Sequence, residues 1–129
     1  MTQNITAPGS DWVAIIGRNS LEDFAQAFVA QPVLEALVLP SPRMGITAMR
    51  DYFDASRTLF EQIAFVREAR AADRVFLEWE GRFAGQPIEG VTILSTAGDG
   101  RFARVRIHCY PQNQADAFAR ALVDREKQP

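Results

Sequence analysis

Residues that bind metals or form disulfides are scarce in this chain of 129 residues, which contains one cysteine and one histidine. The single cysteine, Cys109, excludes an intramolecular disulfide and a zinc site built from several cysteines. The single histidine, His108, excludes a site with several histidine ligands. We therefore expect no bound metal and no cofactor.

A basic excess and a long apolar run are also lacking. The 14 basic and 16 acidic side chains give a net charge of -2, which disfavours a nucleic-acid-binding protein. No apolar run approaches the length of a membrane span, and the first ten residues lack the pattern of a signal peptide. We expect a cytoplasmic protein that binds neither nucleic acid nor membranes.

Apolar residues, in contrast, are plentiful enough for one core. They make up 47% of the chain and include nine Phe, two Trp and two Tyr. The length and this composition predict a single domain over residues 10–126, with flexible termini at residues 1–9 and 127–129.

Helical spacing dominates the first half of the sequence. A short helix is predicted over Asp11–Gly17, and a second one over Leu21–Phe28, which Pro32 is expected to end. Val33–Leu39 is predicted to form a strand. A long helix with a wide apolar stripe is predicted over Ile46–Glu61.

The second half has the period-two alternation of strands. Strands are predicted at Ile63–Ala71, through Val75–Glu80, at Ile88–Ser95 and at Phe102–Tyr110, followed by a helix after Pro111. This order predicts an α+β fold in which a curved antiparallel sheet wraps around the long helix. Such an arrangement can leave a cavity between the helix and the sheet.

Three glycine-containing motifs each precede one of the predicted elements. They are Gly45-Ile46 followed by Met49 and Tyr52-Phe53, Gly85-Gln86-Pro87-Ile88 before a central strand, and Gly100-Arg101-Phe102 before the last strand. Together with the element order, from Trp12 to Pro111, they resemble the nuclear transport factor 2-like superfamily. That superfamily includes ketosteroid isomerases and polyketide-cyclase-like (SnoaL-like) proteins. The resemblance implies a cystatin-like, cone-shaped sheet with an apolar pocket at its wide end, and often a homodimer formed through the outer sheet face.

The chain departs from the isomerase pattern at both catalytic positions. The resemblance places Leu39-Pro40 where the isomerases have their catalytic base, an Asp followed by Pro. Leucine cannot accept a proton. The strand that carries their oxyanion-stabilising Asp corresponds to Val91–Leu94, which contains no acid. Steroid isomerisation by that mechanism is therefore not expected.

Two residues remain candidates for catalysis. If Leu39 faces the pocket, alternation places Glu35 on the same face, where desolvation would raise the pKa of its carboxyl group and suit it to acid–base chemistry. The alternative is a bulge near Pro32 that turns Glu35 to solvent. The Tyr52 hydroxyl is placed to donate a hydrogen bond to a ligand carbonyl, or else belongs to a core aromatic at a water-filled edge.

The expected lining of the pocket is mainly apolar. Cys109 faces inward and His108 outward, because adjacent strand residues face opposite ways, and this excludes a Cys–His dyad. Core packing is the simpler role for Trp79, Thr92 and Cys109. The residues expected around the pocket are Trp12, Tyr52, Phe53, Leu77, Trp79, Thr92, Val105, Ile107 and Cys109.

The outer face of the sheet combines charged and apolar side chains. Arg104, Arg106 and His108 are expected to face Glu78, Glu80 and Glu89 in a cross-strand charge lattice. The apolar patch on this face is expected to form a homodimer interface, and its residues are Phe76, Val91, Ile93, Phe102 and Tyr110.

Two functions are compatible with these patterns. The first is a domain that binds a small apolar molecule in its pocket, with or without acid–base isomerase, cyclase or lyase chemistry. The alternative is a non-enzymatic homodimeric protein-interaction module that uses the outer sheet face. The sequence does not identify the ligand.

Overall fold

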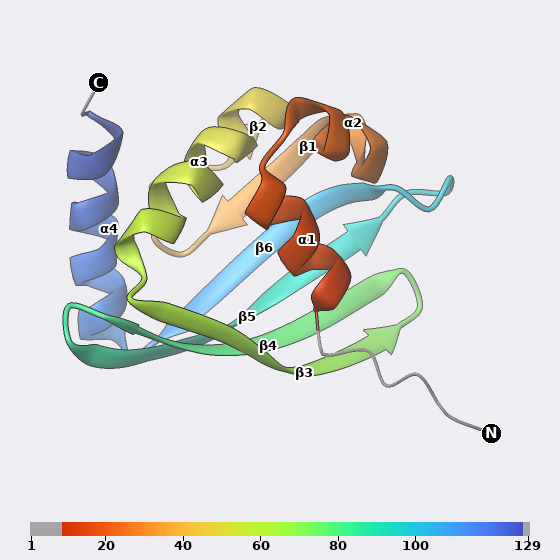
Figure 1. Cartoon of the computed structure of the whole chain (residues 1–129). Coiled ribbons are helices and arrows are strands. Elements are labelled where there is room, and N and C mark those ends of the chain that lie inside the picture. The colour runs from red at the N-terminus through yellow and green to blue at the C-terminus, as the bar shows by residue number, and fades with distance from the viewer. Residues whose placement is uncertain (1–8, 128–129) are drawn as a thin grey trace.

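A computed structural model describes residues 9–127 and shows helices packed against one face of a curved, six-stranded sheet (Figure 1). The predicted α+β class is thus confirmed. The elements are α1 (Ser10–Arg18), α2 (Leu21–Ala27), β1 (Phe28–Ala36), β2 (Arg43–Met44), α3 (Ile46–Leu59), β3 (Gln62–Ala71), β4 (Arg74–Phe83), β5 (Gln86–Thr96), β6 (Phe102–Tyr110) and α4 (Gln112–Glu126).

The flexible termini predicted at residues 1–9 and 127–129 lie outside the described residues, apart from Gly9 and Lys127. The main-chain N–H of Gly9 donates to Glu68 Oε1 at 3.0 Å, and that of Lys127 donates to Val123 O at 3.3 Å. In the described part of the chain, no helix is both long and apolar enough to cross a membrane.

The sheet has the strand order β2-β1-β6-β5-β4-β3. Strands β3 to β6 form the predicted antiparallel meander, and β2 also runs antiparallel to β1. Strand β1, however, pairs with β6 in parallel. The alternation of apolar residues within a strand does not specify the direction of its neighbour, so the sequence could not predict this parallel pair.

Strand β1 begins earlier than predicted, and Pro32 lies inside it rather than ending a helix. Helix α2 ends at Ala27. The pairing of β1 with β6 shifts register between Phe28 and Val33, as expected where proline removes a ladder N–H. Beyond this shift Leu34 is fully buried, and Glu35 faces the opposite side of the sheet.

Helix α3 spans nearly the predicted residues and lies over the concave face of the sheet (Figure 1). Its apolar side faces the sheet. Met49, Tyr52 and Phe53 are buried on this side. The Trp12 ring, from α1, packs edge-on against Phe53 at a centroid separation of 5.3 Å and against Phe28 at 6.0 Å. Helices α1 and α3 are thereby joined to β1 through one aromatic cluster.

Helix α4 covers one end of the sheet. Its Phe118 ring lies 4.8 Å from the ring of Phe60 and 5.0 Å from that of Phe83. The buried Gln114 side chain donates from Nε2 to Phe83 O at 2.7 Å and to Gln86 O at 3.1 Å. Helix α4 is thus fixed to the β4–β5 hairpin by both apolar and polar contacts.

Phe102 does not belong to the outer face, contrary to the sequence-based expectation. A register shift between β5 and β6 at Ser95 and Thr96 adds one residue to the start of β6. The shift turns the Phe102 ring inward, where it lies 5.6 Å from Phe28 and 6.4 Å from Trp12. A single bulged residue moves the side chains that precede it in the strand to the opposite face of the sheet.

Candidate functional site: an apolar cavity between helix α3 and the sheet

A cavity of about 240 Å³ lies between helices α1 and α3 and the concave face of the sheet. Its volume exceeds the ~150 Å³ of an apolar cavity that holds one benzene molecule and approaches the ~300 Å³ lower limit of drug-sized pockets. Of the residues expected around the pocket, all line it except Leu77 and Val105. These two side chains are buried in the core instead.

Several lining residues were not identified from the sequence. Phe60 and Phe118 close the cavity toward α4, and Ile16 and Val38 contribute from α1 and from the segment after β1. Their apolar spacing was visible in the sequence, but it does not distinguish a residue that lines a cavity from one that fills the core. Arg57, on the partly exposed side of α3, gave no sequence signal.

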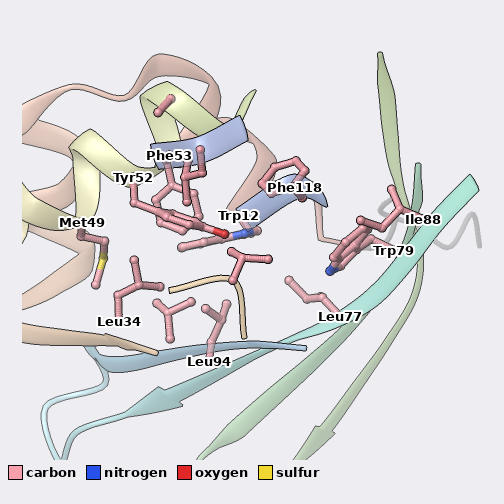
Figure 2. Close-up of a cluster of buried hydrophobic side chains, with 14 of the residues drawn as sticks. Trp12, Leu34, Met49, Tyr52, Phe53, Leu77, Trp79, Ile88, Leu94 and Phe118 are labelled. Carbon is pink, nitrogen blue, oxygen red and sulfur yellow. The ribbon is translucent and has the colours of Figure 1, made fainter. Parts of the chain in front are cut away.

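Tyr52 is one of the polar residues that line the cavity, together with Ser56, Arg57 and Thr92. Its side chain points from α3 into the cluster of buried side chains (Figure 2), and the residue is 4% exposed. Among the described residues, its hydroxyl has no hydrogen-bond partner. Burial raises the pKa of Tyr52, so the phenol stays neutral and can donate a hydrogen bond.

Glu35 does not face the cavity, so this prediction is wrong. Its carboxylate accepts a hydrogen bond from Arg104 Nε and lies 3.4 Å from Arg106 Nη2 on the other face of the sheet. Desolvation tends to raise the pKa of Glu35, but the hydrogen bonds and charges of the two arginines outweigh it and lower the pKa. The register shift near Pro32 matches the alternative recognised from the sequence. The inference from Leu39 fails because β1 ends at Ala36 and the chain turns there, with the Leu39 N–H donating to Ala36 O at 2.9 Å, so the alternation does not run from Leu39 back to Glu35.

The predicted charge lattice also differs in its pairings. Strand β5 separates β4 from β6, so the β6 arginines pair with Glu35 of β1. Glu78 pairs instead with Arg67 of β3 at 3.0 Å. Among the described residues, no cluster of three or more His, Cys, Asp or Glu side chains could hold a metal ion.

Cys109 lines the cavity from β6, while the neighbouring His108 is exposed on the outer face. A dyad of these two residues is therefore excluded by geometry, as expected. Burial raises the pKa of the Cys109 thiol to about 11. The thiol is protonated near neutral pH and has little nucleophilic character.

Alkylation of Cys109 should therefore be slow in the folded protein. Because a pKa of about 11 lies two units above the ordinary value of 9.0, the thiolate population near pH 8 should fall about 100-fold. Iodoacetamide labelling, followed by mass spectrometry, should be correspondingly slower in the native protein than in urea. Equal rates in the two states would show that the thiol is not held in an apolar cavity.

Comparisons with known proteins identify the fold. No protein-family model and no curated protein matches the chain. A steroid delta-isomerase from Pseudomonas aeruginosa matches with a TM-score of 0.79 over 90% of this chain and 86% of that chain, at 20% identity. A protein with a cystatin-like fold from Silicibacter pomeroyi gives 0.80 over 90% and 82%, at 10% identity. A protein assigned as a SnoaL-like polyketide cyclase from Jannaschia gives 0.66 over 92% and 98%, at 10% identity.

The chain therefore has the cystatin-like fold that its resemblance at the sequence level implied. At these identities the likeness concerns the fold. The same fold serves many activities, so the function has to be argued from the residues of this cavity.

Proposed function

We propose that the protein binds a small, largely apolar molecule in the cavity and that Tyr52 donates a hydrogen bond to an acceptor, such as a carbonyl oxygen, on that molecule. The Tyr52 hydroxyl carries the proposal, because the side chain lines the apolar cavity and the hydroxyl makes no hydrogen bond to another described residue. A hydrogen bond from this hydroxyl to an acceptor on the ligand would contribute about 0.5–1.5 kcal/mol.

The lining residues favour binding over proton abstraction. None of the described residues that line the cavity is a carboxylate or a histidine. Burial raises the pKa of both Tyr52 and Cys109 and keeps both groups protonated near neutral pH. The isomerase and cyclase names of the structural neighbours suggest acid–base chemistry, but this cavity offers a hydrogen-bond donor rather than a general base.

The Tyr52→Phe variant tests this role of the hydroxyl. We expect 2-acetylnaphthalene, which carries a carbonyl, to bind the variant about tenfold more weakly than the parent, since one hydrogen bond contributes about 1.4 kcal/mol. Naphthalene, which has no acceptor, should bind both proteins equally. Isothermal titration calorimetry measures both affinities. An unchanged affinity for the ketone would remove Tyr52 from the site.

We also propose that the protein forms a homodimer through the outer sheet face. The patch that remains after the correction of Phe102 comprises Phe76, Val91, Ile93 and Tyr110, of which Tyr110 is 66% exposed and the other three are half-buried. Exposed apolar groups gathered on one face are typical of an interface, and a twofold contact between copies is its commonest use. A protein-interaction module, the alternative function, would use the same patch.

Sedimentation should therefore give a mass of twice the 14.4 kDa chain. The Ile93→Arg variant should sediment as a monomer, because it adds a charge beside Arg106 at the centre of the patch. Val123→Arg is the matched control, since Val123 is 47% exposed on α4 and lies outside the patch. A monomeric parent would contradict the dimer.

A further inference from the structure

Arg57 brings the only full charge among the described residues that line the cavity. It follows Ser56 on α3 and lies beside Gly17 of α1, and all three residues contribute to the lining. The remainder of the lining is apolar or neutral. A single cation at the border of an apolar cavity favours a ligand that carries a negative charge at one end.

The present partners of Arg57 leave its guanidinium available. Nη1 donates to Gly17 O at 3.0 Å, and Nη2 pairs with Asp54 at 3.0 Å. The Arg57 and Asp54 side chains are 50% and 63% exposed, and an exposed pair of this kind contributes ~1 kcal/mol or less. A guanidinium has five N–H donors, so three remain after these contacts.

Other charged groups do not replace Arg57 at this position. Arg50, about two turns earlier on α3, donates from Nε to Asn19 O at 2.9 Å but does not line the cavity. Arg104 and Arg106 are bound to Glu35 on the opposite face of the sheet. An anionic group of a ligand in the cavity would therefore meet Arg57.

We propose that the ligand is an amphipathic carboxylate, whose apolar body occupies the cavity and whose carboxylate pairs with the Arg57 guanidinium at the border. This rests on the proposed function, since it requires the cavity to hold a small molecule. It adds that the charge of the ligand determines affinity. Arg57 is thus a specificity-determining residue rather than a cap of α1 alone.

The experiment compares 2-naphthoate with 2-naphthamide, which have the same rings and a similar shape but differ in charge. Calorimetric titration of the parent should give about tenfold tighter binding of naphthoate. Arg57→Gln should abolish this preference by weakening the binding of naphthoate. Arg50→Gln is the matched control, because it also removes an arginine that caps the C-terminus of α1, and it should keep the preference. Circular dichroism checks that both variants remain folded.

The outcomes separate this inference from the proposed function. Equal affinity of the parent for the two probes, or a preference that survives Arg57→Gln, would overturn the role of Arg57 and leave the cavity a binding site for neutral molecules. Failure of both probes and of 2-acetylnaphthalene to bind the parent would overturn the proposed function itself. A preference that both Arg57→Gln and Arg50→Gln abolish would indicate loss of the α1 contact and also overturn the inference.

Discussion

The Gly90→Ala variant should be destabilised by about 3 kcal/mol or more. A Cβ atom at Gly90 would lie 2.1 Å from His108 O and 2.4 Å from the Trp79 ring. Neither group can move freely: His108 O belongs to the backbone of β6, and the buried Trp79 ring packs against Phe60 at 5.6 Å. Urea unfolding, followed by circular dichroism, measures the loss.

Gly98→Ala is the matched control for this prediction. A Cβ atom at Gly98, in the turn between β5 and β6, would meet nothing within 4 Å. Its free energy of unfolding should stay within about 1 kcal/mol of the parent, because the substitution also restricts the unfolded chain. A Gly90→Ala variant as stable as Gly98→Ala would show that Trp79 does not lie across Gly90.

Filling the cavity should abolish ligand binding. In the Cys109→Phe variant, an aromatic ring should occupy the space that the small thiol leaves beside Tyr52 and Thr92, all of which line the cavity. Affinity for 2-acetylnaphthalene should fall more than about 100-fold, since exclusion from the cavity forfeits ~3 kcal/mol of apolar burial. Calorimetric titration measures this loss.

His108→Phe provides the control with the same new side chain on the next residue. His108 is exposed on the outer face, so this variant should bind the ketone as the parent does. Equal weakening by both substitutions would indicate a general disturbance of β6. Unchanged binding by Cys109→Phe would place the ligand outside the cavity.

The fold was predictable because the periodicities are strong. The strands of the meander alternate in the sequence as they do in the sheet, and α3 begins at Ile46 as predicted. The errors lie where the alternation is interrupted. The end of β1 at Ala36 interrupts the alternation that was assumed between Leu39 and Glu35, and the shift at Ser95 turns Phe102 inward. A sequence pattern does not locate such interruptions, although proline within a strand is a signal for one.

The site was predictable only in part. The alternation of side chains along the strands predicted that Thr92 and Cys109 face the concave side of the sheet, where the structure places them. Arg57 was missed because a charged residue beside an apolar helical stripe is usually solvated. Its position at the cavity depends on how α1 crosses α3, a tertiary contact without a local sequence signal.

Among the described residues, the cavity lining contains no carboxylate and no histidine that could act as the base of an isomerase. The sequence resemblance implied that leucine stands at the position of the isomerases' catalytic base, and the acidic candidate Glu35 is paired with arginines on the outer face. The groups that remain, the Tyr52 phenol and the Arg57 guanidinium, are hydrogen-bond donors. Donors of this kind suit recognition of a carbonyl or carboxylate on an apolar molecule.

The most direct test is an NMR titration of the isotope-labelled protein with 2-acetylnaphthalene, in which intermolecular contacts locate the bound ligand. The account predicts contacts from the naphthyl protons to Tyr52, Trp79 and Thr92, between α3 and the sheet. Contacts to Tyr110 and Val91 on the outer face, or no contacts at saturating ligand, would contradict it.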